Sequence, residues 1–316
     1  MADKAYEYMD WPRIEAIVYG EEAAPRDVMQ PRVTDDGVLI QGFFPGTEAA
    51  EVIVGKKSYP MTLEDEAGYY AVMLPLKRIP EYRFQVTRGS MKEAFFDAYE
   101  YPCQITEEEE KAFCAGVYYE AYKKLGAHLS VEDGVQGVYF GVWAPNAAQV
   151  NVIGTFNEWN EESHPMQKLG EGGIWGLFIP GVEEGTMYKF LIYARDGRKL
   201  YKADPFANYA EYRPGTASIV TDITGFDWRD SKWMEARDKK DMNKEPMAIY
   251  ECHIGSFMKH PNNGTAEGFY NYREFADRII EYLKEMKYTH VELMGIAEHP
   301  FDGSWGCLLY TSDAAD

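Results

Sequence analysis

Four acidic residues in the last third of the chain are the first candidates for chemistry, because two carboxyl groups can act as a general acid and a nucleophile. They are Glu251, Glu292, Glu298 and Asp302. Spacing along the chain does not show whether any two of them face one site, and function depends on that geometry. We therefore interpret them as carboxylates at strand ends or in loops, and we assign no catalytic residue in this sequence.

The histidines and cysteines do not indicate a metal site. The 6 histidines include no H-E-x-x-H pair, and the 4 cysteines include no C-x-x-C pair. Such spacings are what zinc sites use, and scattered cysteines are typical of reduced thiols. We expect no metal and no cofactor.

Charge and aromatic content indicate the kind of partner. Lys and Arg total 32 against 52 Asp and Glu, a formal charge of -20, so the surface repels phosphate backbones and anionic lipid. A neutral polysaccharide is indifferent to this charge, and 24 Tyr and 7 Trp supply flat faces on which sugar rings could stack, although most large aromatic side chains are buried. Residues 1–13 lack the apolar region of a signal peptide, and no stretch has the length of a membrane span. We expect a cytoplasmic protein that binds neither nucleic acid nor membrane.

The first two thirds of the chain contain an internal repeat. Residues 37–46 (GVLIQGFFPG) align with residues 137–146 (GVYFGVWAPN), an offset of 100. Later landmarks recur in the same order, and the pairs are Pro60 and Pro165, Gly68 and Gly173, Tyr82 and Tyr188, and Asp97 and Asp204. Two copies of one module are the simplest interpretation.

Each copy contains short runs of alternating apolar and polar residues, such as residues 188–193, separated by Gly, Pro and Asn turns. This pattern within about 100 residues predicts an immunoglobulin-like β-sandwich. Between the copies, Thr106 and Glu109 have the spacing of a capping box, which predicts a helix that continues to about Leu125. Residues 6–19 predict another short helix, with Pro12 in its first turn.

The pattern changes near residue 245. Residues 229–246 are polar and predict a linker, and residues 247–254 predict a buried strand. Apolar residues recur at helical spacing from Phe275 to Met286, and residues 289–294 are again strand-like. Strand, helix and strand form a β-α-β unit with parallel strands. Fewer than 75 residues follow Glu245, whereas a complete (β/α)8 barrel takes about 250.

Several strings resemble one family. Residues 125–128 (LGAH), 137–147 (GVYFGVWAPNA), 154–160 (GTFNEWN), 164–166 (HPM) and 202–205 (KADP) resemble the glycogen-binding sandwich of 1,4-α-glucan branching enzymes, a carbohydrate-binding module of family forty-eight. Residues 250–257 (YECHIGSF) and 289–306 (THVELMGIAEHPFDGSWG) resemble the first and second barrel strands of the same enzymes, in glycoside hydrolase family thirteen of the α-amylase superfamily.

The resemblance implies a mainly β fold with two tandem immunoglobulin-like β-sandwiches, followed by the first β-α-β portion of an incomplete (β/α)8 barrel. The predicted parts are an N-terminal helix and first sandwich (1–105), a linker helix (106–128), the glycogen-binding-type sandwich (129–228), a linker (229–246), the start of the barrel (247–306) and a tail foreign to the family (307–316). After Gly306 the family continues with Tyr-Gln, whereas this chain continues with Cys307. We attribute the difference to a frameshift or an assembly join.

The implied reaction cuts an α-1,4 link in glycogen or amylose and reattaches the segment as an α-1,6 branch, with carboxylates on later barrel strands as nucleophile and acid. None of those strands is matched here, so we expect an inactive, monomeric N-terminal part of such an enzyme. Two alternatives stay open. One is a non-catalytic α-glucan-binding protein, and the other is a debranching or trehalose-releasing hydrolase of the same superfamily.

The resemblance also suggests substrate-binding residues. Trp159 matches a tryptophan on which some relatives stack glucose rings, and Lys189 matches a lysine that donates to sugar hydroxyls. Alternatively, Trp159 covers a sandwich edge and Lys189 is solvated. The second stacking tryptophan is absent, because residues 196–199 (DGRK) occupy its turn. His299 and Trp305 follow the second barrel strand, where they could line the donor groove.

Overall fold

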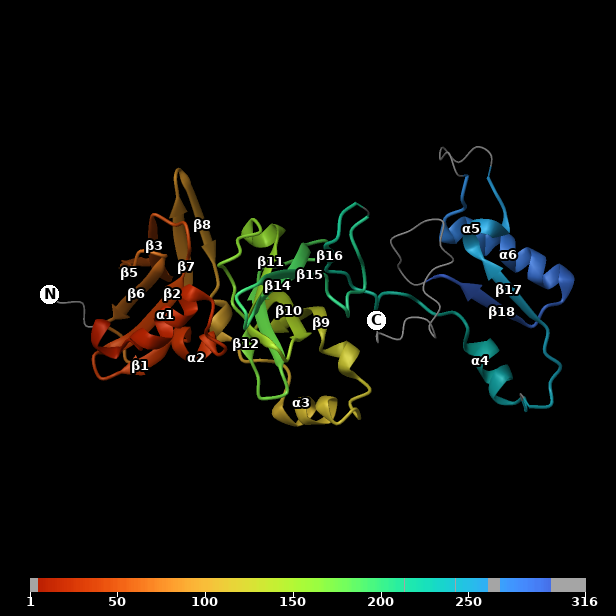
Figure 1. The fold of residues 1–316 in the computed structure, drawn as a ribbon, viewed down its shortest axis with the longest axis horizontal. Coiled ribbons are helices and arrows are strands. Elements are labelled where there is room, and N and C mark those ends of the chain that lie inside the picture. Colours follow the sequence, from red (N-terminus) through yellow and green to blue (C-terminus); the bar gives the residue numbers. More distant parts are fainter. Residues whose placement is uncertain (1–4, 213, 242, 261–267, 297–316) are drawn as a thin grey trace. The chain divides into compact units, whose positions relative to one another are not determined.

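The computed structural model describes residues 5–296, except 213, 242 and 261–267. The chain divides into two compact units, residues 1–226 and residues 227–316. The first unit holds two β-sandwiches, and the second holds a small β-α-β element (Figure 1). None of the helices in the described part is both long enough and apolar enough to cross a membrane.

The first sandwich consists of two antiparallel four-stranded sheets. One sheet has the order β1-β2-β6-β5, and the other has the order β4-β3-β7-β8. The strands are β1 (Arg32–Thr34), β2 (Gly37–Phe43), β3 (Ala49–Val54), β4 (Lys57–Pro60), β5 (Thr62–Asp65), β6 (Tyr69–Leu74), β7 (Arg83–Arg88) and β8 (Met91–Phe95).

The second sandwich repeats this arrangement. Its sheets have the orders β12-β13-β10-β9 and β11-β14-β15, with β16 also paired to β14. Read from β9, the first sheet (β9-β10-β13-β12) has the same strand order as β1-β2-β6-β5 of the first sandwich. The second sheet (β11-β14-β15) has the same order as β3-β7-β8. The strands are β9 (Gly126–Glu132), β10 (Val135–Trp143), β11 (Ala147–Gly154), β12 (Gln167–Lys168), β13 (Ile174–Pro180), β14 (Met187–Ala194), β15 (Lys199–Lys202) and β16 (Ser218–Ile219). The predicted pair of tandem sandwiches is confirmed.

Glycines that align in the repeat make the same backbone contact. The Phe44 amide donates to the Gly68 carbonyl at 2.8 Å, and the Ala144 amide donates to the Gly173 carbonyl at the same distance. Both glycines have positive φ, +108° and +84°, and a Cβ would lie 2.7 Å from the Phe44 oxygen or 2.3 Å from the Pro145 Cα. Only glycine combines this conformation with such a close approach.

A buried tyrosine–aspartate pair also occurs once in each sandwich. The Tyr82 hydroxyl donates to Asp97 Oδ2 at 2.5 Å, and the Tyr188 hydroxyl donates to Asp204 Oδ2 at 2.5 Å. The other carboxylate oxygen of each aspartate accepts a backbone amide two residues later, at 2.8 Å. Burial raises the pKa of Asp97 to about 7 and also raises the pKa of Asp204. The tyrosine and aspartate that align in the repeat therefore form the same buried hydrogen bond in both copies.

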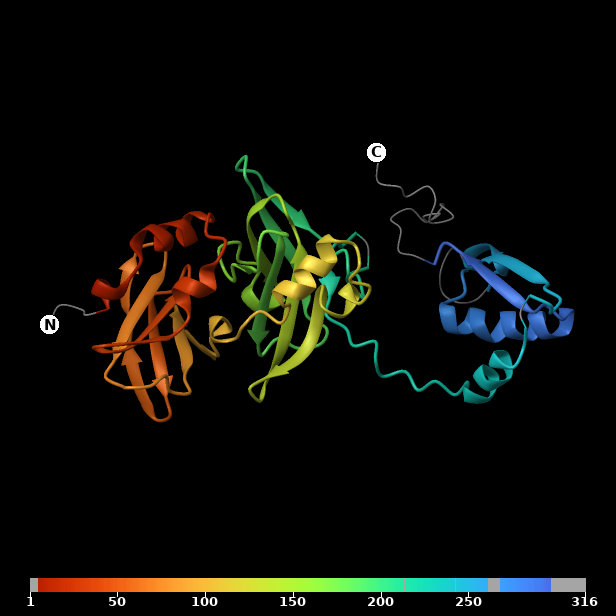
Figure 2. The same cartoon turned by 90° about the horizontal axis from the view of Figure 1, so that it is seen from below.

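Each sandwich has a helical segment over the outer face of its first sheet (Figure 2). All of β2 is buried, because Val38 and Ile40 face the sandwich core while Leu39 and Phe43 pack with residues of the N-terminal helices. In the second copy, β10 and β13 pack likewise against residues 101–125. The covering elements are η1 (Tyr6–Tyr8), α1 (Trp11–Tyr19) and α2 (Pro25–Met29) in the first copy, and η2 (Ala98–Glu100), α3 (Glu107–Cys114) and η3 (Ala121–Lys123) around the second.

The predicted helices differ in extent from those observed. The Thr106–Glu109 capping box is present, but α3 ends at Cys114 rather than near Leu125. Gly116, in the left-handed region with φ +72°, turns the chain there. The N-terminal helix α1 begins at Trp11, with Pro12 in its first turn as predicted.

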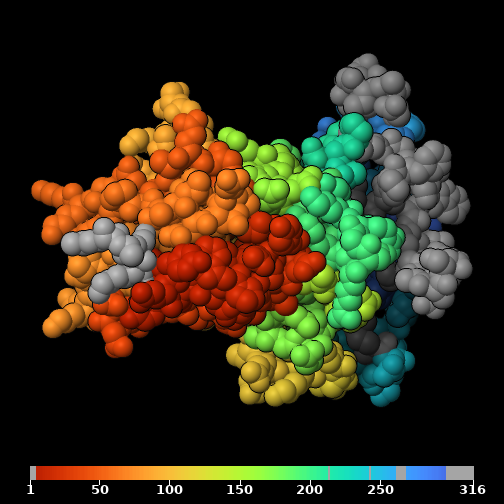
Figure 3. All heavy atoms as spheres, turned by 60° about the vertical axis from the view of Figure 1, so that its left-hand side comes forward, coloured from red at the N-terminus to blue at the C-terminus, as the bar shows by residue number. Residues whose placement is uncertain are grey.

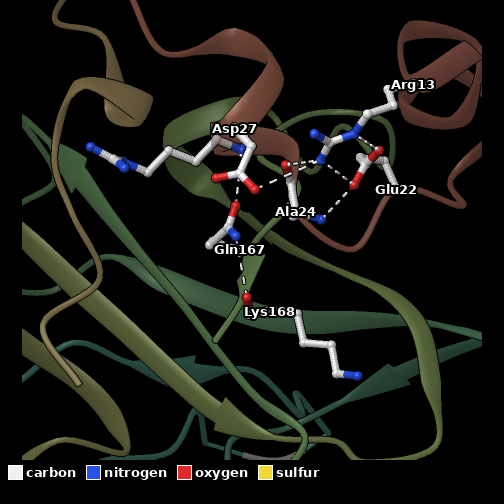
Figure 4. Close-up of polar contacts among 7 residues, drawn as sticks. Arg13, Glu22, Ala24, Asp27, Gln167 and Lys168 are labelled. Carbon is white, nitrogen blue, oxygen red and sulfur yellow. Dashed lines mark hydrogen bonds and ion pairs between the residues drawn. The ribbon is translucent and has the colours of Figure 1, made fainter. Parts of the chain in front are cut away.

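Polar contacts join the N-terminal helices to the second sandwich (Figure 4). The Arg26 amide donates to Gln167 Oε1 at 3.0 Å, and the Lys168 amide donates to the Ala23 carbonyl at 2.7 Å. The loop that makes these contacts is fixed by Arg13, which donates to both oxygens of Glu22 at 2.9 Å. Burial acts to raise the pKa of Glu22, but the bonds from Arg13 and Ala24 outweigh it and lower the pKa. In the space-filling view the N-terminal segment, in red, lies against the second sandwich, in green (Figure 3).

The second unit contains the predicted β-α-β element. The strands β17 (Ile249–His253) and β18 (His290–Met294) are parallel, and α6 (Tyr272–Met286) connects them. Asn271 caps the N-terminus of α6. Phe275 and Ile279, on the apolar side of this helix, pack against Cys252. A short helix, α5 (Ile254–Phe257), follows β17. The predicted linker at 229–246 contains an unexpected helix, α4 (Ser231–Asp238), formed by good helix formers such as Lys, Met, Glu, Ala and Arg.

Candidate functional site

The two sandwiches differ most at the connection that follows β3 in the first copy and β11 in the second. A two-residue turn, Gly55-Lys56, joins β3 to the edge strand β4. In the second copy β11 is followed by a short helical turn, η4 (Thr155–Asn157), and then by irregular chain as far as β12. We call residues 155–166 the η4 loop. It has no counterpart in the first sandwich.

Three residues of the η4 loop have positive φ although none is a glycine. The φ angles are +54° at Glu158, +59° at Trp159 and +55° at His164. Such backbone conformations are uncommon for these residue types, and they persist where the surroundings impose them, often at functional sites. The concentration in one loop makes it the leading candidate for a binding site in this unit.

Asn157 holds the first half of the η4 loop. Its Oδ1 accepts the Gly154 amide at 2.9 Å, and its Nδ2 donates to the Val152 carbonyl at 3.0 Å. The same Nδ2 lies 3.1 Å from His164 Nδ1. The Trp159 amide donates to the Gly154 carbonyl at 2.9 Å, so the indole is carried on a fixed backbone.

Glu161 holds the second half of the loop against the sheet β11-β14-β15. Its carbonyl accepts Asn151 Nδ2 at 2.8 Å and the Tyr193 hydroxyl at 2.9 Å. Its carboxylate accepts a bond from the Tyr201 hydroxyl and one from Lys199 Nζ, the latter at 2.9 Å. These two bonds lower the pKa of Glu161. The carboxylate is therefore ionised at neutral pH and can accept both bonds.

The structure places the predicted residues Trp159 and Lys189 at the same end of the β11–β14 pair. Lys189 is paired in register with Ile153, next to the Gly154 carbonyl that binds the Trp159 amide. Both side chains are partly exposed. Lys189 Nζ donates to Thr216 Oγ1 at 2.6 Å, so it is not simply solvated.

The other predicted residues are not assembled into a site. His299 and Trp305 lie outside the described residues, as do Glu298 and Asp302. Glu251 and Glu292 are exposed and directly paired across β17 and β18. Within the described part of the chain, no group of three or more His, Cys, Asp or Glu side chains could hold a metal ion.

Inspection of the sequence did not identify Asn157, Glu161, His164 or Tyr201. A signal for the η4 loop was nevertheless present, because the repeat offset grows from 100 at Gly37 and Gly137 to 105 at Pro60 and Pro165. That increase marks an insertion in the second copy between the two landmarks, and the η4 loop occupies it.

Comparison with known proteins agrees with this domain order. Residues 10–99 match the model of the N-terminal domain of the alpha-1,4-glucan branching enzyme GlgB, and residues 124–207 match carbohydrate-binding module 48, the isoamylase N-terminal domain. The chain is homologous to the N-terminal part of 1,4-alpha-glucan branching enzymes. The GlgB domain falls on the first sandwich and the carbohydrate-binding module falls on the second. The family predicted from the residues is therefore confirmed.

The alignments of this chain with individual GlgB relatives differ in length and identity. The 1,4-alpha-glucan branching enzyme GlgB of Butyrivibrio fibrisolvens is 66% identical over 202 residues, 64% of this chain and 32% of the relative. Those of Bacillus cytotoxicus and Nitrosospira multiformis are 49% identical over 200 residues and 39% identical over 303 residues. These alignments cover 63% and 93% of this chain, and 30% and 40% of the relatives. The chain thus spans about a third of the length of the relatives it matches.

Proposed function

We propose that this chain is the glucan-binding front part of a cytoplasmic, monomeric enzyme that cuts α-1,4 links in a linear glucan and transfers the segment to form α-1,6 branches in glycogen. The observation that carries the proposal is the tandem match, a branching-enzyme N-terminal domain followed by a carbohydrate-binding module. The same pairing favours a branching enzyme over a debranching or trehalose-releasing relative.

The proposed chemistry requires a nucleophilic carboxylate and an acid on opposite sides of the bond that is cut. No residue of this chain is assigned either role, so we expect the 316-residue polypeptide to bind glucan without branching it. In the whole enzyme we propose that His299 and Trp305 contribute to the donor groove.

We propose that glucan binds at the η4 loop. The Trp159 indole offers a flat apolar face for a sugar ring, and Lys189 offers a donor at the same end of the β11–β14 pair. The Asn157 and Glu161 bonds hold the backbone in place before the ligand arrives. Such preorganisation reduces the entropy lost on binding.

Affinity electrophoresis of the 316-residue chain in gels with and without glycogen tests this site. We expect glycogen to retard the chain, and Trp159→Asn to reduce the apparent affinity at least tenfold, since burial of a large apolar side chain contributes about 1.5–3 kcal/mol. Asparagine is chosen because it tolerates positive φ. Tyr119→Ala is the matched control, because Tyr119 is an aromatic residue that is 84% exposed outside the η4 loop.

Two results would contradict the proposal. One is equal retardation of the Trp159→Asn variant and the unaltered chain. The other is a change in the iodine staining of amylose incubated with the 316-residue chain, which would show that the polypeptide carries its own catalytic groups.

A further inference from the structure

A cavity of about 360 Å³ lies between the two sandwiches of the first unit. One wall comes from the first sandwich, from β7, β8 and the residues that follow as far as Tyr99. The other comes from Phe156, Asn157, Ser163 and His164 of the η4 loop and from residues 179–182. The η4 loop therefore contributes to this cavity as well as carrying Trp159. Volumes of about 300–1,000 Å³ are typical of small-molecule sites.

Arg83 is an unpaired cation at this cavity. Its side chain is exposed, and its guanidinium lies 4.2 Å from the centre of the Phe96 ring. Among the described residues no carboxylate forms an ion pair with it, whereas the neighbouring Arg88 is paired with Glu93 at 3.3 Å. A guanidinium stacked on an aromatic ring keeps its planar set of donors available for an oxyanion.

His164 adds a second donor to the cavity wall. The Gly154 amide and the Val152 carbonyl fix the orientation of the Asn157 side-chain amide, so its Nδ2 is the donor to His164 Nδ1. His164 Nδ1 is then an acceptor, and the proton of the neutral ring is on Nε2. Burial, with a smaller effect from Arg88, lowers the pKa of His164 to about 4. The ring is therefore neutral at pH 7 and presents an Nε2–H donor.

The acceptors on the cavity wall are largely occupied. Both Asp97 oxygens already accept bonds, from the Tyr82 hydroxyl and the Tyr99 amide. The Asn157 side chain is bonded to Gly154 and Val152 of β11, and Glu93 is paired with Arg88. Among the lining side chains, Arg83 and His164 keep donors available, and they lie among the rings of Phe95, Phe96 and Phe156. This combination suits a molecule with an oxyanion and a flat-sided ring.

We propose that the cavity between the sandwiches binds an anionic monosaccharide, a sugar ring that carries a phosphate ester or a carboxylate, with Arg83 holding the oxyanion and Phe156 against the ring. The site shares the η4 loop with the proposed glucan site but does not include Trp159 or Lys189, and the inference does not depend on the proposed branching activity. It would give the two sandwiches a ligand in common.

Isothermal titration of the 316-residue chain at pH 7 tests the inference with four probes, glucose 6-phosphate, glucuronate, glucose and inorganic phosphate. We expect one of the two anionic sugars to bind at least tenfold more tightly than glucose or inorganic phosphate. Which of the two binds identifies the oxyanion. We expect Arg83→Ala to weaken that binding at least tenfold, since hydrogen bonds to charged groups contribute about 1.5–3 kcal/mol.

Three further variants separate a binding role from a structural one. Arg83→Lys keeps the charge without the planar fork and should give intermediate affinity. His164→Asn keeps a residue that tolerates positive φ and should weaken binding severalfold. Arg198→Ala is the control, because Arg198 is exposed, pairs with Asp196 and is not part of the cavity wall. Thermal unfolding of each variant verifies that it folds. If Arg83→Ala does not fold, the affinity of Arg83→Lys decides whether Arg83 binds the anionic sugar.

The inference is overturned if neither anionic sugar binds, if glucose or inorganic phosphate binds as tightly, or if the folded Arg83 variants bind like the unaltered chain. Because none of these results depends on glycogen retardation, failure here is distinguishable from failure of the glucan site.

Discussion

The two sandwiches are copies of one module, yet only the second contains the η4 loop. Strand order, the glycine contacts and the tyrosine–aspartate bond are shared. Where the first copy has the Gly55-Lys56 turn, the second has a loop with three residues of positive φ. The shared features account for folding, and the feature present in one copy is where we place binding. Comparison of the two copies thus distinguishes residues that maintain the shared fold from those that we propose for binding.

The largest expected effect tests the shared part of the comparison. Gly68→Ala and Gly173→Ala should each lower the free energy of unfolding by about 2–4 kcal/mol, because each adds a Cβ against backbone atoms and forces alanine into positive φ. Chemical denaturation monitored by circular dichroism measures both.

Gly55→Ala and Gly181→Ala are the matched controls, since these glycines also have positive φ but nothing lies within 4 Å of the added Cβ. They should cost only about 1 kcal/mol, the cost of the left-handed conformation alone. If the paired glycines cost no more than these controls, or if Gly68 and Gly173 differ widely, the two contacts are not the same structural device.

A smaller effect concerns the aspartates. The folded-state pKa of Asp97, about 7, lies above its ordinary value of 3.8, so the folded state binds the proton more tightly than the unfolded state. The contribution of Asp97 to stability is therefore present at pH 4 and is lost as the pH rises through about 7. Asp97→Asn should remove this dependence of the free energy of unfolding on pH.

The measurement is the difference in denaturation midpoint between pH 5 and pH 8. Comparing this difference between each variant and the unaltered chain cancels the contributions of the other carboxylates. Asp204→Asn should reduce the slope in the same direction, because burial also raises the pKa of Asp204. An unchanged slope in both variants would mean that the tyrosine and amide bonds hold the two carboxylates ionised.

Much of the fold could be predicted from the sequence because local patterns carry it. The repeat, the α6 periodicity and the parallel strands all depend on spacing, and the structure has each of them. The end of α3 and the presence of α4 were missed. Gly116 stops α3 about three turns before the predicted end, and α4 follows helix propensity in a stretch that looked like a linker. Both depend on backbone preferences rather than on hydrophobic spacing.

The candidate site was less predictable. Trp159 and Lys189 could be proposed from the resemblance, but their common position follows from the register of Ile153 with Lys189. The partners of Asn157 and Glu161 lie on β11, β14 and β15, and nothing in a local sequence pattern indicates those contacts. The covering of β2 and β10 by helical segments was missed for the same reason, since it depends on contacts between distant parts of the chain.

The central claim is that glucan binds at the η4 loop and not at its counterpart in the first sandwich. Amide hydrogen exchange of the unaltered 316-residue chain, with and without maltoheptaose, tests it without any substitution. We predict added protection in residues 155–166 and in β14 around Lys189, with no change at Gly55-Lys56 and β4. Protection in the first sandwich instead, or no added protection in the η4 loop at a saturating concentration, would contradict the claim.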